Sequence, residues 1–245
     1  MANQNPYPFL GPNPNRSVGP NGIAGAGVAT DLRSYLIRVY NYMAAGLALT
    51  GVTAYLGATS GFYARTVGTP LYWLILFAPL GLVFLIGGRI QRMSVAAAQL
   101  SFWVFAALVG LSLSGIFFVY TGQSIERVFF ITAGTFGAAS LYAYTTRSDL
   151  SRFGSFLLMG LFGVIIASVV NIFLKSTALQ MTVSVMGVIV FTGLTAYDTQ
   201  RIRAYYVQGE DGTITTKKSI LGALSLYLDF LNLFLSLLQL TGSRR

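Results

Sequence analysis

The sequence contains no cysteine and no histidine among its 245 residues. Without cysteine there can be no disulfide and no thiolate metal site. The absence of histidine removes the commonest general base and the commonest transition-metal ligand, and also the only side chain whose unperturbed pKa lies near neutrality. Any response to pH near neutrality must therefore come from carboxylates in an unusual environment.

Charged residues are also scarce, because they make up only 9% of the chain while hydrophobic residues make up 54%. An ordinary soluble domain has roughly 25% charged residues. Uncharged apolar runs long enough to cross a hydrocarbon core of about 30 Å, which takes roughly 20 helical residues, recur along nearly the whole chain. The pattern predicts an all-α membrane protein with seven transmembrane helices, over residues 34–57, 70–88, 94–119, 127–146, 153–174, 178–204 and 217–241.

Acidic residues are fewer than basic ones, with 7 Asp and Glu against 16 Lys and Arg and a net charge of +9. The basic residues stand singly or in pairs between apolar runs and form no basic stripe interleaved with aromatics, so we exclude nucleic acid as a partner. If the N-terminus is cytoplasmic, eleven basic residues fall on the cytoplasmic side. Five fall on the other side, namely Arg65, Arg127, Lys175, Arg244 and Arg245. The positive-inside rule favours this orientation.

The first thirty residues differ in composition from the rest of the chain. They are rich in Asn, Pro and Gly and lack both an apolar core and a cleavage signature. This composition predicts a disordered cytoplasmic tail and not a signal peptide. The expected organisation is therefore a tail over residues 1–30, followed by one transmembrane domain over residues 31–245.

Two of the seven acidic residues stand inside apolar runs. Asp198 follows ten uncharged residues in VIVFTGLTAYDTQRIR, and Asp229 lies in the middle of an uncharged run from Ser219 to Ser243. An ionisable residue at a helix centre costs at least about 2.5 kcal/mol, so each aspartate is by default a candidate for function. Asp198 also has an ordinary explanation, because Arg201 at i+3 could pair with it near the membrane interface.

The last two predicted helices form a hairpin that relates the two aspartates. The midpoint between positions 198 and 229 is 213.5, beside Gly212 and Thr213 in the turn sequence YYVQGEDGTITTKK. At about 1.5 Å per residue, an antiparallel hairpin bent there would place both carboxylates at similar depth. Two carboxylates in a poorly solvated site cannot both ionise cheaply, so a facing pair would share a proton and act as a pH-sensitive latch.

Other polar residues near the pair are candidates for a weak cation site. Hard cations such as Ca²⁺ prefer oxygen ligands, and Asn232, Thr195 and Tyr227 could add oxygens to the two carboxylates. Such a sparse set predicts weak and transient binding, which suits passage better than storage. Arg89 and Arg92 end the second predicted helix on the side of the hairpin turn and could supply a counter-charge, although both also fit positive-inside anchoring.

The segments GLTAYDTQRIR and LSLYLDFLNLFLSLLQL closely resemble the paired signatures of the Bax inhibitor-1 family, also called transmembrane Bax inhibitor motif proteins. FWVFAALVGLSLSGIFFVY is also similar to that family's pattern, and the likeness covers about residues 30–243. The resemblance implies seven helices with the last one central and the other six around it, in the inner (plasma) membrane of a bacterium. It also implies a pH-sensitive Ca²⁺ leak with Asp198 and Asp229 as sensor, and an arginine latch, for which Arg92 is our first choice and Arg89 the second.

Two other functions require sequence features that this chain lacks, and a third function is left open. An intramembrane aspartyl protease needs Gly-x-Gly-Asp at its second acid, where this chain has LYLD, and a retinal protein needs a lysine inside the last helix, where none follows Lys218. We therefore expect no enzymatic activity and no cofactor, with Ca²⁺ as the permeant ion. The alternative left open is a regulatory protein without transport activity that modulates a membrane-bound ATP-dependent protease through residues 1–30, as is implied for some bacterial relatives.

Overall fold

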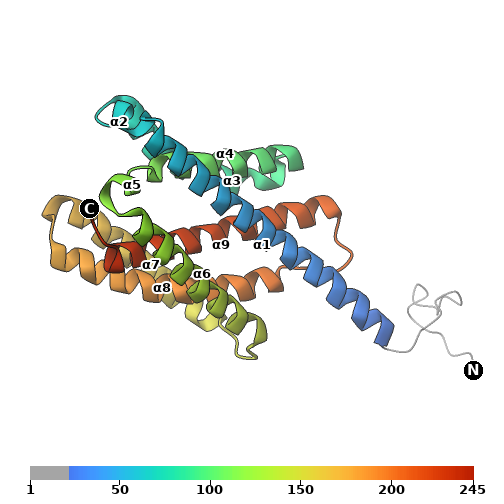
Figure 1. Cartoon of the computed structure of the whole chain (residues 1–245). Coiled ribbons are helices and arrows are strands. Elements are labelled where there is room, and N and C mark those ends of the chain that lie inside the picture. The colour runs from blue at the N-terminus through green and yellow to red at the C-terminus, as the bar shows by residue number, and fades with distance from the viewer. Residues whose placement is uncertain (1–21) are drawn as a thin grey trace, which may run out of the picture.

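The structure is a computed structural model that describes residues 22–245, and these residues are almost entirely helical (Figure 1). Six stretches within them are long and apolar enough to cross a membrane. The helical segments are α1 (Gly22–Thr59), α2 (Phe62–Thr66), α3 (Pro70–Arg89), the 3₁₀ turn η1 (Ile90–Arg92), α4 (Val95–Leu113), α5 (Ile116–Val119), α6 (Gly122–Thr145), α7 (Ser151–Leu174), α8 (Thr177–Ala204) and α9 (Gly212–Thr241).

Six of the seven expected helices are confirmed, with ends that differ by five residues or fewer when α4 and α5 are taken together. The first expected helix, 34–57, lies inside α1 but is not among the six apolar stretches. Glycine, threonine and tyrosine dilute the apolar half of α1, which reads YMAAGLALTGVTAYLGAT. Residues 22–30, which the composition assigns to the tail, already belong to α1, and the rest of the predicted tail, residues 1–21, lies outside the described residues.

The stretch 94–119 is expected to be one helix, but it is interrupted between α4 and α5. Gly115 lies against the ring of Tyr63 from α2, so closely that a Cβ on Gly115 would lie 2.9 Å from the Tyr63 hydroxyl oxygen. The hydroxyl of the preceding Ser114 donates a 2.6 Å hydrogen bond to the Leu111 carbonyl. The absence of a side chain at Gly115 makes room for Tyr63 of the short helix α2, which the apolar pattern alone does not reveal.

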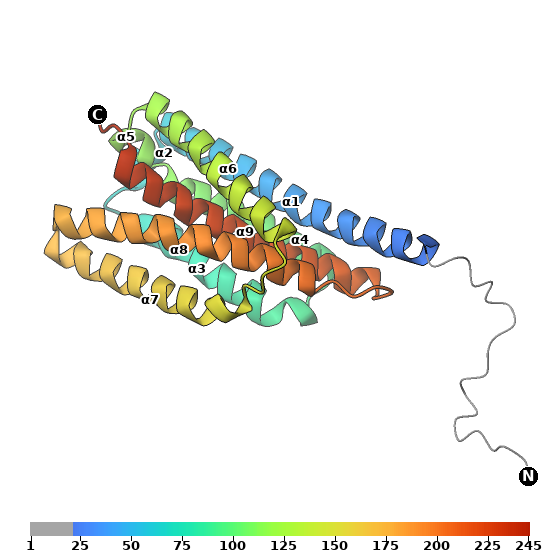
Figure 2. The same cartoon turned by 90° about the horizontal axis from the view of Figure 1, so that it is seen from below.

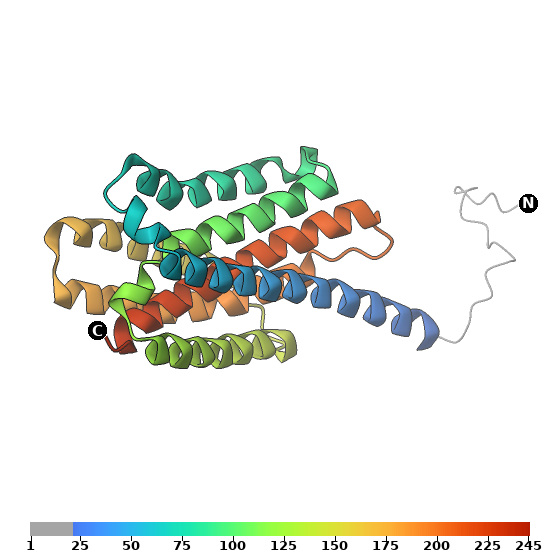
Figure 3. The ribbon, with the colours of Figure 1, turned by 45° about the horizontal axis from the view of Figure 1, so that its top comes forward.

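The connections between helices gather at the two ends of the bundle (Figures 2 and 3). One end carries the start of α1 and the connections α3–α4, α6–α7 and α8–α9. The opposite end carries the connection from α1 to α3, the α7–α8 turn and the C-terminus. The positive-inside rule assigns most basic residues to one side of the membrane. Within the part of the chain that the structure describes, these residues thus lie toward one end of the molecule.

Helix α9 is the most buried of the six apolar stretches, with 61% of its most apolar window inside the protein, against 0% for α7. It packs against α1, α4, α6 and α8. Helix α3 packs mainly on α4, and α7 packs mainly on α8, so these two helices form the outside of the bundle. Any acidic side chain on the inner face of α8 or α9 is consequently shielded from lipid.

Helices α1 and α4 are in close contact at Gly110. A Cβ at this position would collide with the hydroxyl of Thr53 and with the backbone oxygen of Thr50. We expect Gly110→Ala to destabilise the protein by about 1–3 kcal/mol, because backbone atoms cannot move aside as a flexible side chain can. Thermal unfolding in detergent measures the effect. Gly134→Ala is the matched control, since nothing lies within 4 Å of that position, and an equal loss in both variants would contradict the close approach.

Candidate functional site

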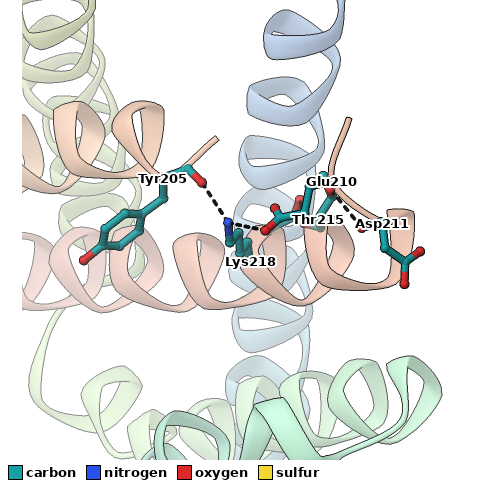
Figure 4. A network of polar contacts seen from close by, with 6 residues as sticks. Tyr205, Glu210, Asp211, Thr215 and Lys218 are labelled. Carbon is teal, nitrogen blue, oxygen red and sulfur yellow. Dashed lines mark hydrogen bonds and ion pairs between the residues drawn. The ribbon is translucent and has the colours of Figure 1, made fainter. Parts of the chain in front are cut away.

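The hairpin of α8 and α9 is held at its turn by a polar network (Figure 4). Lys218 Nζ lies 2.7 Å from Glu210 Oε1 and donates a 3.1 Å hydrogen bond to the Tyr205 carbonyl. The Thr215 hydroxyl donates to the backbone oxygen of Asp211 at 3.2 Å, and the Asp211 side chain caps the first turn of α9. These contacts connect the end of α8 to the start of α9 and fix how the two helices are aligned along each other.

The alignment of α8 with α9 is nearly symmetric about position 212. Tyr205 meets Lys218 near the turn, and far from it the Ser184 hydroxyl donates a 3.0 Å hydrogen bond to Gln239 Oε1. Continuing this alignment places Asp198 opposite Ser225, and Asp229 one helical turn, about 6 Å, further along α9. The expected similar depth of the two aspartates is therefore found with an offset of one turn.

Both aspartates line one cavity of about 330 Å³, here called the aspartate cavity. Asp198 is 8% exposed and Asp229 is 5% exposed. Helix α7 contributes Leu158, Leu161 and Ile165, which are all apolar, so every charged group on the cavity comes from α8 or α9. The polar lining residues are Tyr197, Asp198, Arg201, Ser225, Asp229 and Asn232.

Arg201 is the basic residue that the structure places beside the pair. Its Nη2 lies 3.3 Å from Asp198 Oδ1 and donates a 3.4 Å hydrogen bond to Ser225 Oγ. Its guanidinium carbon lies 5.5 Å from the ring centre of Tyr197 and 5.8 Å from that of Tyr205, within the range of cation–π contacts. The i+3 pairing that the sequence offers as the ordinary explanation for Asp198 is thus present, and it forms part of the cavity.

Two buried polar atoms of this site have no hydrogen-bond partner among the described residues. They are Asp229 Oδ2 and Arg201 Nε. Buried polar atoms are normally satisfied, so each exception requires a functional or structural explanation. Because Asp229 interacts electrostatically with both Asp198 and Arg201, its unsatisfied oxygen belongs to the same charged group of three residues.

A second cavity, of about 270 Å³, borders the aspartate cavity on the side of the hairpin turn, where Tyr205 and Lys218 lie, and we call it the neighbouring cavity. Arg201, Ser225 and Leu228 line both cavities. The wall between the two spaces is therefore made by three side chains, one of which carries the positive charge paired with Asp198.

Of the three accessory ligands expected from the sequence, the structure brings only Asn232 to the aspartate cavity. Its amide nitrogen donates to the Leu228 carbonyl at 2.8 Å, so its side-chain oxygen is the atom that could meet a cation. Thr195 is fully buried and its hydroxyl donates to the Phe191 carbonyl of its own helix at 2.7 Å. Tyr227 points toward α1 and α4. Neither Thr195 nor Tyr227 lines the cavity.

Tyr227 connects α9 to two other helices. The Thr50 hydroxyl donates to the Ala106 carbonyl at 2.9 Å, so its single proton is used and the Tyr227 hydroxyl, 2.6 Å away, must be the donor to Thr50. We expect Tyr227→Phe to lower stability by about 1 kcal/mol through loss of this bond. Thermal unfolding in detergent measures the loss. A melting temperature equal to that of the parent protein would contradict this hydrogen bond.

The two candidate latch arginines, Arg89 and Arg92, lie at the end of α3 and in η1, and both are exposed. Neither lines the aspartate cavity or the neighbouring cavity. Ser225 was not foreseen from the sequence, although its position four residues before Asp229 places it on the same face of α9.

The fold and this site define a polytopic helical membrane protein with two aspartates buried on adjacent helices. Residues 32–245 match the family model described as "Inhibitor of apoptosis-promoting Bax1", and the chain belongs to the Bax inhibitor-1 family. It is 49% identical over 216 residues to RP147 of Rickettsia prowazekii, a match that covers 87% of this chain and 91% of that protein. It is 47% identical over 218 residues to "Inner membrane protein YbhL" of Escherichia coli, covering 87% of this chain and 93% of that protein.

Proposed function

We propose that this protein is a pH-sensitive leak pathway for Ca²⁺ in a bacterial inner membrane, with Asp198 and Asp229 as its proton sensor and cation site. The observation that carries the proposal is the buried and unsatisfied Asp229 Oδ2 on a cavity that Asp229 shares with Asp198. The name of the YbhL relative supports the inner membrane. In this proposal α1 is a seventh span and α9 is the central helix.

The charge of the three-residue group explains why proton loss would admit a cation. With one proton shared between the aspartates, the pair carries one negative charge and Arg201 balances it, so the site is neutral. When that proton leaves, the site has a net charge of −1 in a poorly solvated space. Repulsion between α8 and α9 then rises while a cation entering from either side is attracted. Weak binding by two carboxylates and the Asn232 oxygen suits release.

Arg201 takes the role of counter-charge in this proposal, because it is the arginine beside Asp198. Its pairing with Asp198 and Ser225 keeps the aspartate cavity and the neighbouring cavity apart. A role for Arg92 or Arg89 as a latch stays a prediction, since it needs a conformation in which α3 brings either residue inward.

Flux measurements in proteoliposomes test the proposed function directly. The purified full-length protein is reconstituted, and indicators for Ca²⁺, K⁺ and H⁺ are read over pH 5–8. We expect Ca²⁺ flux that increases with pH and exceeds flux in empty liposomes. Flux of H⁺ or K⁺ without Ca²⁺ would reject Ca²⁺ as the permeant ion, and no flux of any ion would reject transport.

Modulation of a membrane-bound protease makes the opposite prediction about which part of the chain matters. Deletion of residues 2–21 removes no residue of a described helix, so we expect Ca²⁺ flux to stay unchanged in this variant. A modulator would instead lose its effect on the protease with this deletion and keep it in Asp229→Asn. Comparing both variants in both assays separates the two functions.

A further inference from the structure

A polar pocket of about 510 Å³ lies where the α7–α8 turn meets the C-terminal residues. Figure 3 shows these segments at the end of the bundle opposite the α8–α9 turn. This volume falls within the range of about 300–1,000 Å³ that is usual for small-molecule sites. The pocket is formed by the α7–α8 turn together with the end of α9 and the C-terminal residues. Its polar lining includes Asn171, Lys175, Thr177, Gln180, Gln239 and Arg244.

The charge of this pocket is positive. Lys175 and Arg244 both line it, and no acidic residue of the described chain does so. Thr177 is the first residue of α8, whose 28 residues direct the positive end of the helix dipole to the same place. Gln239, whose Oε1 lies 3.0 Å from the Ser184 hydroxyl, also carries an NH₂ group that can donate hydrogen bonds. The pocket is therefore equipped for an anion that accepts several hydrogen bonds.

Arg244 is held at the pocket by its backbone. Residues Tyr120 and Arg244 form an isolated antiparallel bridge. Thr121 N donates to the Ser243 carbonyl at 3.1 Å, and Ser243 N donates to Ser124 Oγ at 2.9 Å. The arginine thus comes from a segment that is fixed against the start of α6, which reduces the conformational entropy lost when it binds a ligand.

Apolar side chains beside the pocket face outward. Ile172 is 68% exposed and Phe173 is 81% exposed, and both lie in the last turn of α7, which ends at Leu174 just before Lys175. None of the α7 window that best fits a membrane is buried in the protein. An anionic group in the pocket would consequently have a hydrocarbon-facing helix directly next to it, as the headgroup of a lipid requires.

We propose that this pocket binds the phosphate group of an anionic phospholipid. Lys175 and Arg244 supply the charge, the side-chain amides supply further hydrogen bonds, and the acyl chains lie along the exposed face of α7. Arginine and lysine both bind phosphate strongly, arginine through two parallel hydrogen bonds. The site is separate from the two aspartates and does not depend on the proposed ion flux.

The test measures lipid binding to the full-length protein in detergent by native mass spectrometry and by melting temperature. The probes are phosphatidylglycerol, phosphatidylcholine and inorganic phosphate. We expect phosphatidylglycerol to bind more tightly than phosphatidylcholine. In the double variant Lys175→Gln/Arg244→Gln the affinity for phosphatidylglycerol should fall by about tenfold or more, since loss of a charge-assisted hydrogen bond commonly costs that much. Arg127→Gln/Arg245→Gln is the matched control, because it removes the same charge outside the pocket and should change affinity by less than about twofold.

Three results decide the proposal. Equal weakening in the pocket variant and in the control would overturn it, as would equal affinity for the two lipids. Stabilisation by inorganic phosphate that matches phosphatidylglycerol would assign the pocket to a soluble anion and overturn the lipid. If the pocket variant melts early without lipid, Lys175→Arg/Arg244→Lys keeps both charges and should retain the preference for phosphatidylglycerol, and loss of that preference would also overturn the proposal.

Discussion

Replacing Asp229 with Asn is expected to abolish the pH dependence of Ca²⁺ flux while the protein still folds. Asparagine keeps the size and the hydrogen-bonding capacity of the side chain but cannot titrate. The three-residue group would then contain one carboxylate and Arg201, so it could not reach the net charge of −1 that admits a cation. Flux should therefore stay at its low-pH level throughout this range, and the variant should melt no earlier than the parent.

The matched control for Asp229→Asn is Asp149→Asn. Asp149 is an exposed carboxylate just before α7, and a hydrogen bond from the Ser151 backbone N–H at 2.9 Å holds its pKa below the usual range. It is therefore ionised from pH 5 to 8 and should not contribute to the pH profile. Flux against pH in proteoliposomes compares both variants with the parent. A parental profile in Asp229→Asn would place the sensor elsewhere.

Replacing Arg201 with Gln is expected to raise both the midpoint of the flux profile and the flux above it. The guanidinium beside Asp198 favours the state in which both carboxylates are ionised, so without it the shared proton is kept to higher pH. Because an opposite charge at this distance usually has an effect of about one to three pH units, we expect the midpoint to rise by at least about one unit. Above the midpoint the uncompensated pair repels more strongly, which increases the flux.

The parent midpoint expected from a shared carboxylate proton lies between about pH 5 and 7.5, since the chain has no histidine to titrate there. Arg203→Gln is the control for Arg201→Gln, because Arg203 bonds the Tyr144 carbonyl at 3.0 Å and does not line the cavity. Arg89→Ala and Arg92→Ala complete the series. A shifted midpoint in only one of these two variants would assign the latch to that arginine, at the end of α3 or in η1. An unchanged midpoint in all the arginine variants would mean that no arginine is the partner of the carboxylates.

The acidic pair could be found from the sequence because its cost is large and its spacing is simple. An uncharged run around Asp229 has no ordinary explanation, and an antiparallel hairpin relates positions by distance from the turn. The same reasoning could not give rotation about each helix axis. Tyr227 is two residues from Asp229, about 200° around the helix, and so faces Thr50 on the opposite side. Thr195 lies on the side of Asp198, but its hydroxyl bonds to its own helix.

The role of Arg201 cannot be predicted from the sequence, for a different reason. A pair at i and i+3 is ordinary on an exposed helix, where it contributes only a few tenths of a kcal/mol. Only the packing of α9 against α8 shows that this pair is next to Ser225 and between two cavities.

The polar pocket at the α7–α8 turn could not be predicted either. It combines this turn with residues some seventy positions later in the chain, and local sequence patterns do not show that such distant residues meet.

The wall of three side chains between the two cavities also bears on the speed of opening. Side chains change rotamer in picoseconds to nanoseconds when they are free, whereas helices shift in microseconds to milliseconds. If Arg201 leaves Asp198 and Ser225 by a rotamer change, the passage opens without a change in the backbone. Openings would then be too brief to resolve singly, and an electrical recording would show a steady mean current in place of discrete steps.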